Sequence, residues 1–166
     1  MDIDKERQDR IKRHAEIPNH GVPGAVVLAI AAVIGDAEIA AAWTDWNTTT
    51  DTQATTWTCW VVTERTVGYV RVIYQNARYD EHAERQHKLT PSEQSAWVRP
   101  LTDVTKPQWG AFCEAQEKDN AYYPADPITV TFTDGEATIP KKRELPVDQR
   151  SKADRFLTAL RKGTHL

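Results

Sequence analysis

The chain has 166 residues, of which 40% are hydrophobic and 27% are charged, and its formal net charge is −3. This is the composition of one globular domain of ordinary size, which can bury enough surface to fold without metal or disulfide staples. Dedicated nucleic-acid-binding domains are usually basic, so the near-neutral balance predicts no nucleic-acid partner.

The first 36 residues are predicted to form helices. Residues 2–16 have a plausible N-cap at Asp2 but only a thin apolar stripe, which indicates a weakly held helix. Residues 25–34 are apolar throughout and precede Gly35, so we expect a short buried helix that ends there, with a buried strand as the competing interpretation.

The apolar run at residues 25–34 also bears on location. Ten residues are too few to cross a bilayer, which needs about 20. The residues before the run carry basic and acidic side chains in equal number, whereas the start of a secretory signal is positively charged. We therefore predict a cytoplasmic protein, in which Cys59 is a buried free thiol.

From residue 37 onward the composition favours β-structure, since Trp, Val, Ile, Tyr and Thr dominate several short segments. Between the expected strands lie a threonine-rich connection at 48–54, a polar segment at 77–95 and an irregular stretch at 105–127. The segment at 77–95 is either a long loop or a loop with a helical turn after Pro91. The expected strands cover residues 37–47, 55–63, 66–76 and 97–104.

The last two elements have the clearest patterns. Residues 128–133 alternate apolar side chains with threonine, and Asp134-Gly135 is a typical two-residue hairpin turn. Residues 151–162 are predicted to form a helix with Ser151 as N-cap and Gly163 as its end. Its apolar stripe consists of Ala153, Phe156, Leu157 and Leu160.

Four segments together resemble the bacterial pleckstrin-homology-like (PH-like) superfold. They are the strand pair that includes 60–67, the segment 101–104, the hairpin at 128–140 and the helix at 151–162. The resemblance implies an α+β fold in which a strongly bent seven-stranded antiparallel sheet or barrel is capped by a C-terminal helix. We expect residues 37–163 to form this domain and residues 1–36 to be a helical extension.

Such folds bind lipids, peptides and proteins, so the resemblance does not define an activity. Lipid-binding members use converging basic residues near the first hairpin loop, whereas this chain has no Lys or Arg between His14 and Glu64 and has several carboxylates there. Phosphoinositide or membrane binding is therefore not expected.

Candidate partner-binding residues come from aromatic and basic side chains. Trp43 and Trp46 have opposite parity on one expected strand, so at most one of them can point fully into one core. The other needs a cover from within the chain or from a partner. The only dense basic patch is Lys141, Lys142 and Arg143, for which a solvated turn and an acidic partner are both open interpretations.

No catalytic motif, phosphate-binding loop or metal site is predicted. His82 and His87 are five residues apart, which places them on different faces of a helix, so they do not match a zinc site. We expect a non-catalytic protein-interaction or regulatory module without a cofactor. It would bind an unknown protein partner through exposed aromatic residues, a sheet edge or the basic patch. The alternative is a small enzyme or ligand binder with a pocket at the open end of the barrel, and the oligomeric state stays open.

Overall fold

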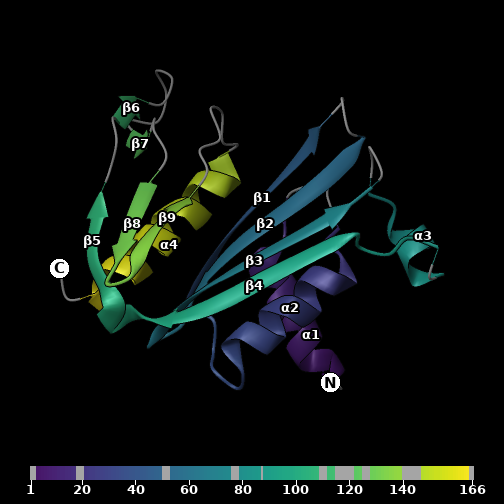
Figure 1. Ribbon diagram of the computed structural model, residues 1–166, viewed down its shortest axis with the longest axis horizontal. Coiled ribbons are helices and arrows are strands. Elements are labelled where there is room, and N and C mark those ends of the chain that lie inside the picture. Colours follow the sequence, from purple (N-terminus) through teal and green to yellow (C-terminus); the bar gives the residue numbers. More distant parts are fainter. Residues whose placement is uncertain are drawn as a thin grey trace.

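A computed structural model of the chain describes residues 3–17, 21–49, 53–75, 79–86, 88–108, 112–114, 122–124, 128–139 and 147–164. The fold is α+β (Figure 1). A four-stranded antiparallel sheet has the order β1 (Ala41–Thr49), β2 (Ala54–Val62), β3 (Thr66–Tyr74) and β4 (Glu93–Pro100). A three-stranded antiparallel sheet has the order β5 (Val104–Gln108), β8 (Ile128–Phe132) and β9 (Gly135–Ile139), and β6 (Phe112–Glu114) pairs with β7 (Tyr122–Pro124).

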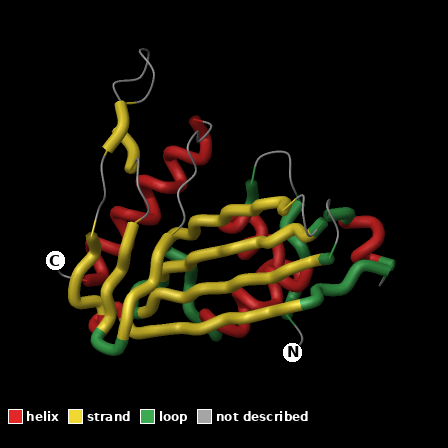
Figure 2. Tube along the Cα trace, turned by 45° about the horizontal axis from the view of Figure 1, so that its top comes forward, coloured by secondary structure: helices red, strands yellow, loops and turns green. Residues whose placement is uncertain are grey.

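Helices cover both faces of the four-stranded sheet. Helices α1 (Lys5–Ala15) and α2 (Gly24–Ile34) pack on one face, and α4 (Val147–Thr164) packs on the other, beside the three-stranded sheet (Figures 1 and 2). Two hydrophobic cores result, one on each side of the same sheet. Successive side chains of a strand point to opposite faces of the sheet, so they enter different cores in turn.

The seven main strands divide four and three, and the described residues form no closed barrel. The structure thus shows two antiparallel sheets with α4 packed against the four-stranded one, and the expected bent barrel stays a prediction. The N-terminal helices share one core with the four-stranded sheet, and the division of the chain at residue 36 stays a prediction.

The two N-terminal helices form as predicted, with small differences at their ends. Asp4 rather than Asp2 is the N-cap of α1, because its carboxylate accepts a hydrogen bond from the Arg7 amide at 2.8 Å. Helix α2 ends at Gly35, whose positive φ of 55° is a conformation that favours glycine. In the described part of the chain, no helix has the length and apolarity needed to span a membrane.

The segment between the two sheets differs from the sequence prediction. The expected strand at 97–104 is broken after Pro100 by a 3₁₀ turn, Leu101–Asp103, which carries the chain from β4 to β5. Leu101 is buried there. The expected helical turn lies before Pro91 rather than after it, as helix α3 (Glu81–Arg85).

The late hairpin is confirmed, but its turn lies one residue earlier than predicted. Phe132 pairs with Gly135, so Thr133 and Asp134 form the turn and Gly135 begins β9. Neither turn residue has the positive φ that a typical two-residue hairpin turn requires. The Thr133 amide donates a hydrogen bond to the Asp103 carbonyl, in the 3₁₀ turn before β5. The turn therefore depends on a tertiary contact that its own sequence does not reveal.

Three residues of the predicted stripe of helix α4, Phe156, Leu157 and Leu160, lie in the core, and the burial of the fourth, Ala153, is outside what the structure describes. The helix begins at Val147, before the predicted N-cap Ser151, and continues through Gly163, which was expected to end it. A side chain at position 163 would clash with Leu101, so this glycine allows a close approach rather than a helix end.

Candidate interaction surface

The two tryptophans predicted as partner contacts lie on opposite faces of the four-stranded sheet. Trp43 is 9% exposed and packs edge-to-face on Phe156 of α4, with ring centroids 6.3 Å apart. Trp46 is half-buried and stacks on Trp57 on the other face, at 6.4 Å. Both are covered from within the chain. Lys141, Lys142 and Arg143 lie outside the described residues, and a binding role for all five residues stays a prediction.

A second group of basic residues surrounds the C-terminus of α1. Arg13, His14, Lys152 and Arg155 line a cavity of about 70 Å³, and the Lys152 ammonium donates to the Glu16 carbonyl. Burial and the nearby cations lower the pKa of His14. Cations at a helix C-terminus offset its partial negative charge, so this group has a structural explanation.

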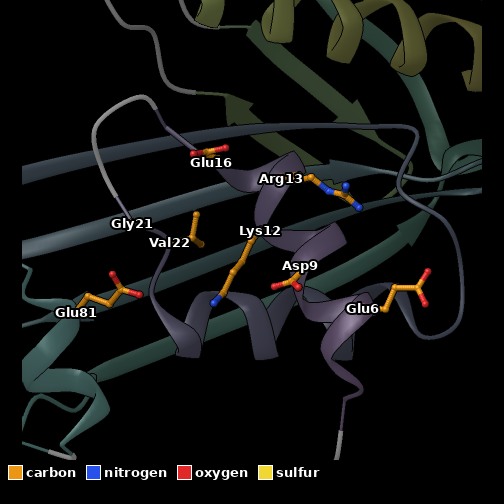
Figure 3. Close-up of a pocket in the computed structure, with 8 residues that line it drawn as sticks. All are labelled: Glu6, Asp9, Lys12, Arg13, Glu16, Gly21, Val22 and Glu81. Carbon is orange, nitrogen blue, oxygen red and sulfur yellow. The ribbon is translucent and has the colours of Figure 1, made fainter.

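A cavity of about 560 Å³, lined mainly by charged residues, lies along α1 (Figure 3). Glu81 approaches from α3 on one side, whereas Glu6 lies at the opposite end and Asp9 lies between them. Because these carboxylates do not converge, they do not form the close pair that acid–base catalysis requires. Among the residues with defined positions, no group of His, Cys, Asp and Glu could hold a metal ion.

The carboxylate of Glu84 in α3 accepts four hydrogen bonds and caps α2 from another element. Its oxygens accept from the amides of Gly24 (2.9 Å) and Ala25 (3.4 Å) and from the hydroxyls of Tyr74 (2.7 Å) and Tyr79 (2.6 Å). Burial first, and these bonds second, raise the pKa of both tyrosines. Since Pro23 provides no cap, Glu84 has a structural role that the sequence did not reveal.

Cys59 is a buried free thiol, as predicted. Burial raises its pKa to about 12, which keeps it protonated at neutral pH and unsuited to nucleophilic chemistry.

Strand β4 forms one edge of the four-stranded sheet. It pairs with β3 on one side, and no described strand pairs with its other side. Six of its eight residues are exposed, and residues 94–98 carry no charge. Most edge strands are protected from pairing by charged side chains, proline or bulges. Here the only proline is at the end of the strand, so the central part of the edge is open to another strand.

The hydrogen-bond phase of β4 follows from its register with β3. Leu101 donates its amide to the Arg65 carbonyl at 2.8 Å, one step beyond the Thr66–Pro100 pair. Hydrogen-bonded pairs alternate along an antiparallel ladder, so the backbone groups of Ser95 and Trp97 point to β3. Those of Gln94, Ala96 and Val98 point to the free edge.

Helix α2 lies beneath this edge and contacts β3 and β4. Its eleven residues include no charged or polar side chain. Leu28 on α2 and Val98 on β4 are each 46% exposed, and they are the large hydrophobic side chains with the most exposure in the described part. An exposed apolar face next to an open strand edge is typical of a protein-binding surface. We define this candidate interaction surface by residues 94–98 of β4. Leu28 and Ala32 are exposed on the neighbouring helix α2.

Sequence reasoning named a sheet edge as one option but did not choose the strand. The uncharged run at 94–98 was a usable signal, although β4 was predicted to start only at Trp97.

Searches against family models, curated proteins and solved structures find no match to this chain.

Proposed function

We propose that this chain is a cytoplasmic, non-catalytic protein-interaction module of PH-like architecture that binds an extended polypeptide strand at the free edge of β4. The PH-like part of the proposal is supported by the order of elements. A four-stranded meander is followed by three further strands in a second sheet and then by a long helix packed against the first sheet.

The observation that carries the interaction is the central part of the β4 edge, residues 94–98, which is uncharged and has outward backbone groups. Main-chain hydrogen bonds to such an edge provide affinity, and alternate side chains of the added strand provide specificity. The added strand would place one set of its side chains over α2, which favours an apolar residue at every second position.

The alternative of a small enzyme or ligand binder has less support. The carboxylates that line the cavity along α1 do not converge on one point. The threonine-rich loop at the expected mouth of the barrel includes residues 50–52, which lie outside the described part.

Proline substitutions test the proposal because they remove single amide donors. Ala96→Pro removes an amide that points away from β3, so we expect the fold to tolerate it while strand addition is lost. Ala96→Thr keeps the amide and should keep binding. Ser95→Pro removes a donor to β3 and leaves the β3 carbonyl without its partner, so it should destabilise the protein by about 1–3 kcal/mol.

The measurement is affinity capture from the native host with the wild-type protein, Ala96→Pro and Ala96→Thr. Proteins held by the wild type and by Ala96→Thr but lost with Ala96→Pro would support strand addition. The same proteins held by all three would show that binding occurs elsewhere.

A further inference from the structure

We infer that the strand added to the β4 edge is β4 of a second copy of this chain, so that the protein forms a two-fold symmetric dimer. The inference rests on the proposed use of this edge and names the partner. The pairing is antiparallel, with Ala96 opposite Ala96 of the second copy.

Hydrogen-bond phase limits the possible registers. The outward backbone groups belong to Gln94, Ala96 and Val98, so an outward residue of one copy must face an outward residue of the other. Centring the pair on Ala96 satisfies this condition: Gln94 faces Val98 of the second copy, and Ala96 faces its own counterpart. The three outward residues of each strand then all take part in the new ladder.

Charge complementarity selects this register among the permitted ones. With Ala96 at the centre, Glu93 of each copy faces Arg99 of the other, which gives two symmetric pairs of opposite charge. The next registers that keep outward residues opposite each other are shifted by two residues. They place Arg99 opposite Pro91 or Ser95, and both charge pairs are lost. Directly opposite charges stabilise a strand pair, whereas like charges destabilise it.

Side-chain size is also complementary in this register. Trp97 of one copy faces Ser95 of the other, so the largest side chain of β4 meets one of the smallest. Trp97 is already held in place by Tyr69, which stacks on it at 5.5 Å, and by Arg99, whose guanidinium lies 5.3 Å from its ring centre. The contact surface is thus preorganised within each copy, which reduces the entropy cost of association.

The other face of the sheet supports the same arrangement. Helix α2 lies below β4, so the two-fold axis brings the two α2 helices to the same side of a continuous eight-stranded sheet. Val98, which is 46% exposed in one copy, lies within the new strand pair and faces Gln94 of the second copy. Burial of this side chain adds a hydrophobic contribution to the strand pair.

The first experiment measures mass in solution by sedimentation or light scattering over a range of protein concentrations. We expect the wild-type protein and Ala96→Thr to show twice the chain mass, and Ala96→Pro to show the mass of one chain. A wild-type protein that stays monomeric at all concentrations would overturn the dimer. The Ala96→Pro-sensitive capture described above would still be able to support the proposed function, so the two failures are distinguishable.

The register is tested by a charge exchange. Glu93→Arg and Arg99→Glu, made singly, each place like charges at both ends of the strand pair, and we expect each to weaken the dimer about tenfold or more. The double variant restores both intermolecular pairs. It does not restore the intramolecular pairs of Arg71 with Glu93 and of Arg99 with Asp134. Recovery of the dimer in the double variant therefore reports the contact between copies, and no recovery would exclude this register.

A cysteine at the symmetry axis gives a second test. Opposite residues in a hydrogen-bonded antiparallel pair have Cα atoms about 5.5 Å apart, within the range of a disulfide. Ala96→Cys should form a disulfide-linked dimer under mild oxidation, whereas Val98→Cys, which faces Gln94, should not. Equal cross-linking of the two variants would contradict the predicted axis.

Discussion

Helices α2 and α4 cover opposite faces of the same sheet, and their outer surfaces differ. The outer side of α4 carries charged and polar residues, among them Asp154, Arg155 and Thr158, while its inner stripe is buried. The outer side of α2 exposes Leu28 and Ala32, and the helix has no polar side chain. A helix that is apolar on all sides is normally buried. The difference indicates that α4 is adapted to water and α2 to further contact with protein.

The largest effect on the free energy of unfolding is expected for a substitution in the core beneath α4. Phe156→Asp places a charge in the core against Trp43, and we expect it to lower the free energy of unfolding by more than about 4 kcal/mol. The matched change on the outer side of α2, Leu28→Asp, should cost about 1 kcal/mol or less. Urea denaturation measures both, and equal costs would remove the distinction between the two helices.

The cap of α2 gives the next largest effect. Glu84→Ala removes the acceptor for two amides and two tyrosine hydroxyls, and we expect a loss of about 2–3 kcal/mol. The control Glu81→Ala removes only an exposed pair with Arg85 and should cost about 0.5 kcal/mol or less.

A spectroscopic titration of the same variant provides an independent measurement. The bonds to Glu84 raise the pKa of Tyr74 and Tyr79, so both phenols should titrate at lower pH in Glu84→Ala. Unchanged tyrosine titration together with unchanged stability would show that α2 does not need this cap.

The contact between α2 and the sheet can be tested at Gly68. A methyl group there would clash with Val33 of α2, so Gly68→Ala should cost about 1–2 kcal/mol. Adding Val33→Ala should recover part of this loss, as a double-mutant cycle would reveal. Gly24→Ala is the matched control, because its methyl group would make only ordinary contacts with Glu84. Equal costs at positions 68 and 24 would contradict a close approach of α2.

The smallest effect concerns His14, where α1 meets α4. Burial and the cations Lys152, Arg13 and Arg155 lower its folded-state pKa below 6.5, and Glu38 acts in the opposite sense. The neutral imidazole is therefore favoured in the folded state, and its contribution to stability is present above pH 6.5 and is lost as the pH falls below that value. The unfolding free energy of His14→Gln should depend less on pH in this range, and an unchanged pH dependence would exclude the effect.

Much of the fold could be predicted because local patterns determine it. The apolar run before Gly35, the alternation at 128–132 and the stripe of Phe156, Leu157 and Leu160 each identify an element and its buried side. The element ends were less predictable. Asp4 capped α1 in place of Asp2, and Gly163 lay inside α4, because caps and close approaches depend on neighbours that the local sequence does not specify.

The candidate interaction surface could be anticipated only in part. The uncharged run at 94–98 and the apolar α2 are visible in the sequence, but no local pattern shows that they adjoin. The sequence by itself determined the clearest elements, such as α2, the late hairpin and α4, and the buried side of α4, because helix and strand periods fix which residues share a face. Only the tertiary structure decided which strand lies at the edge, since strand order depends on contacts between distant segments. The same long-range contacts place α2 beneath that edge and leave its apolar outer side uncovered by the rest of the described chain.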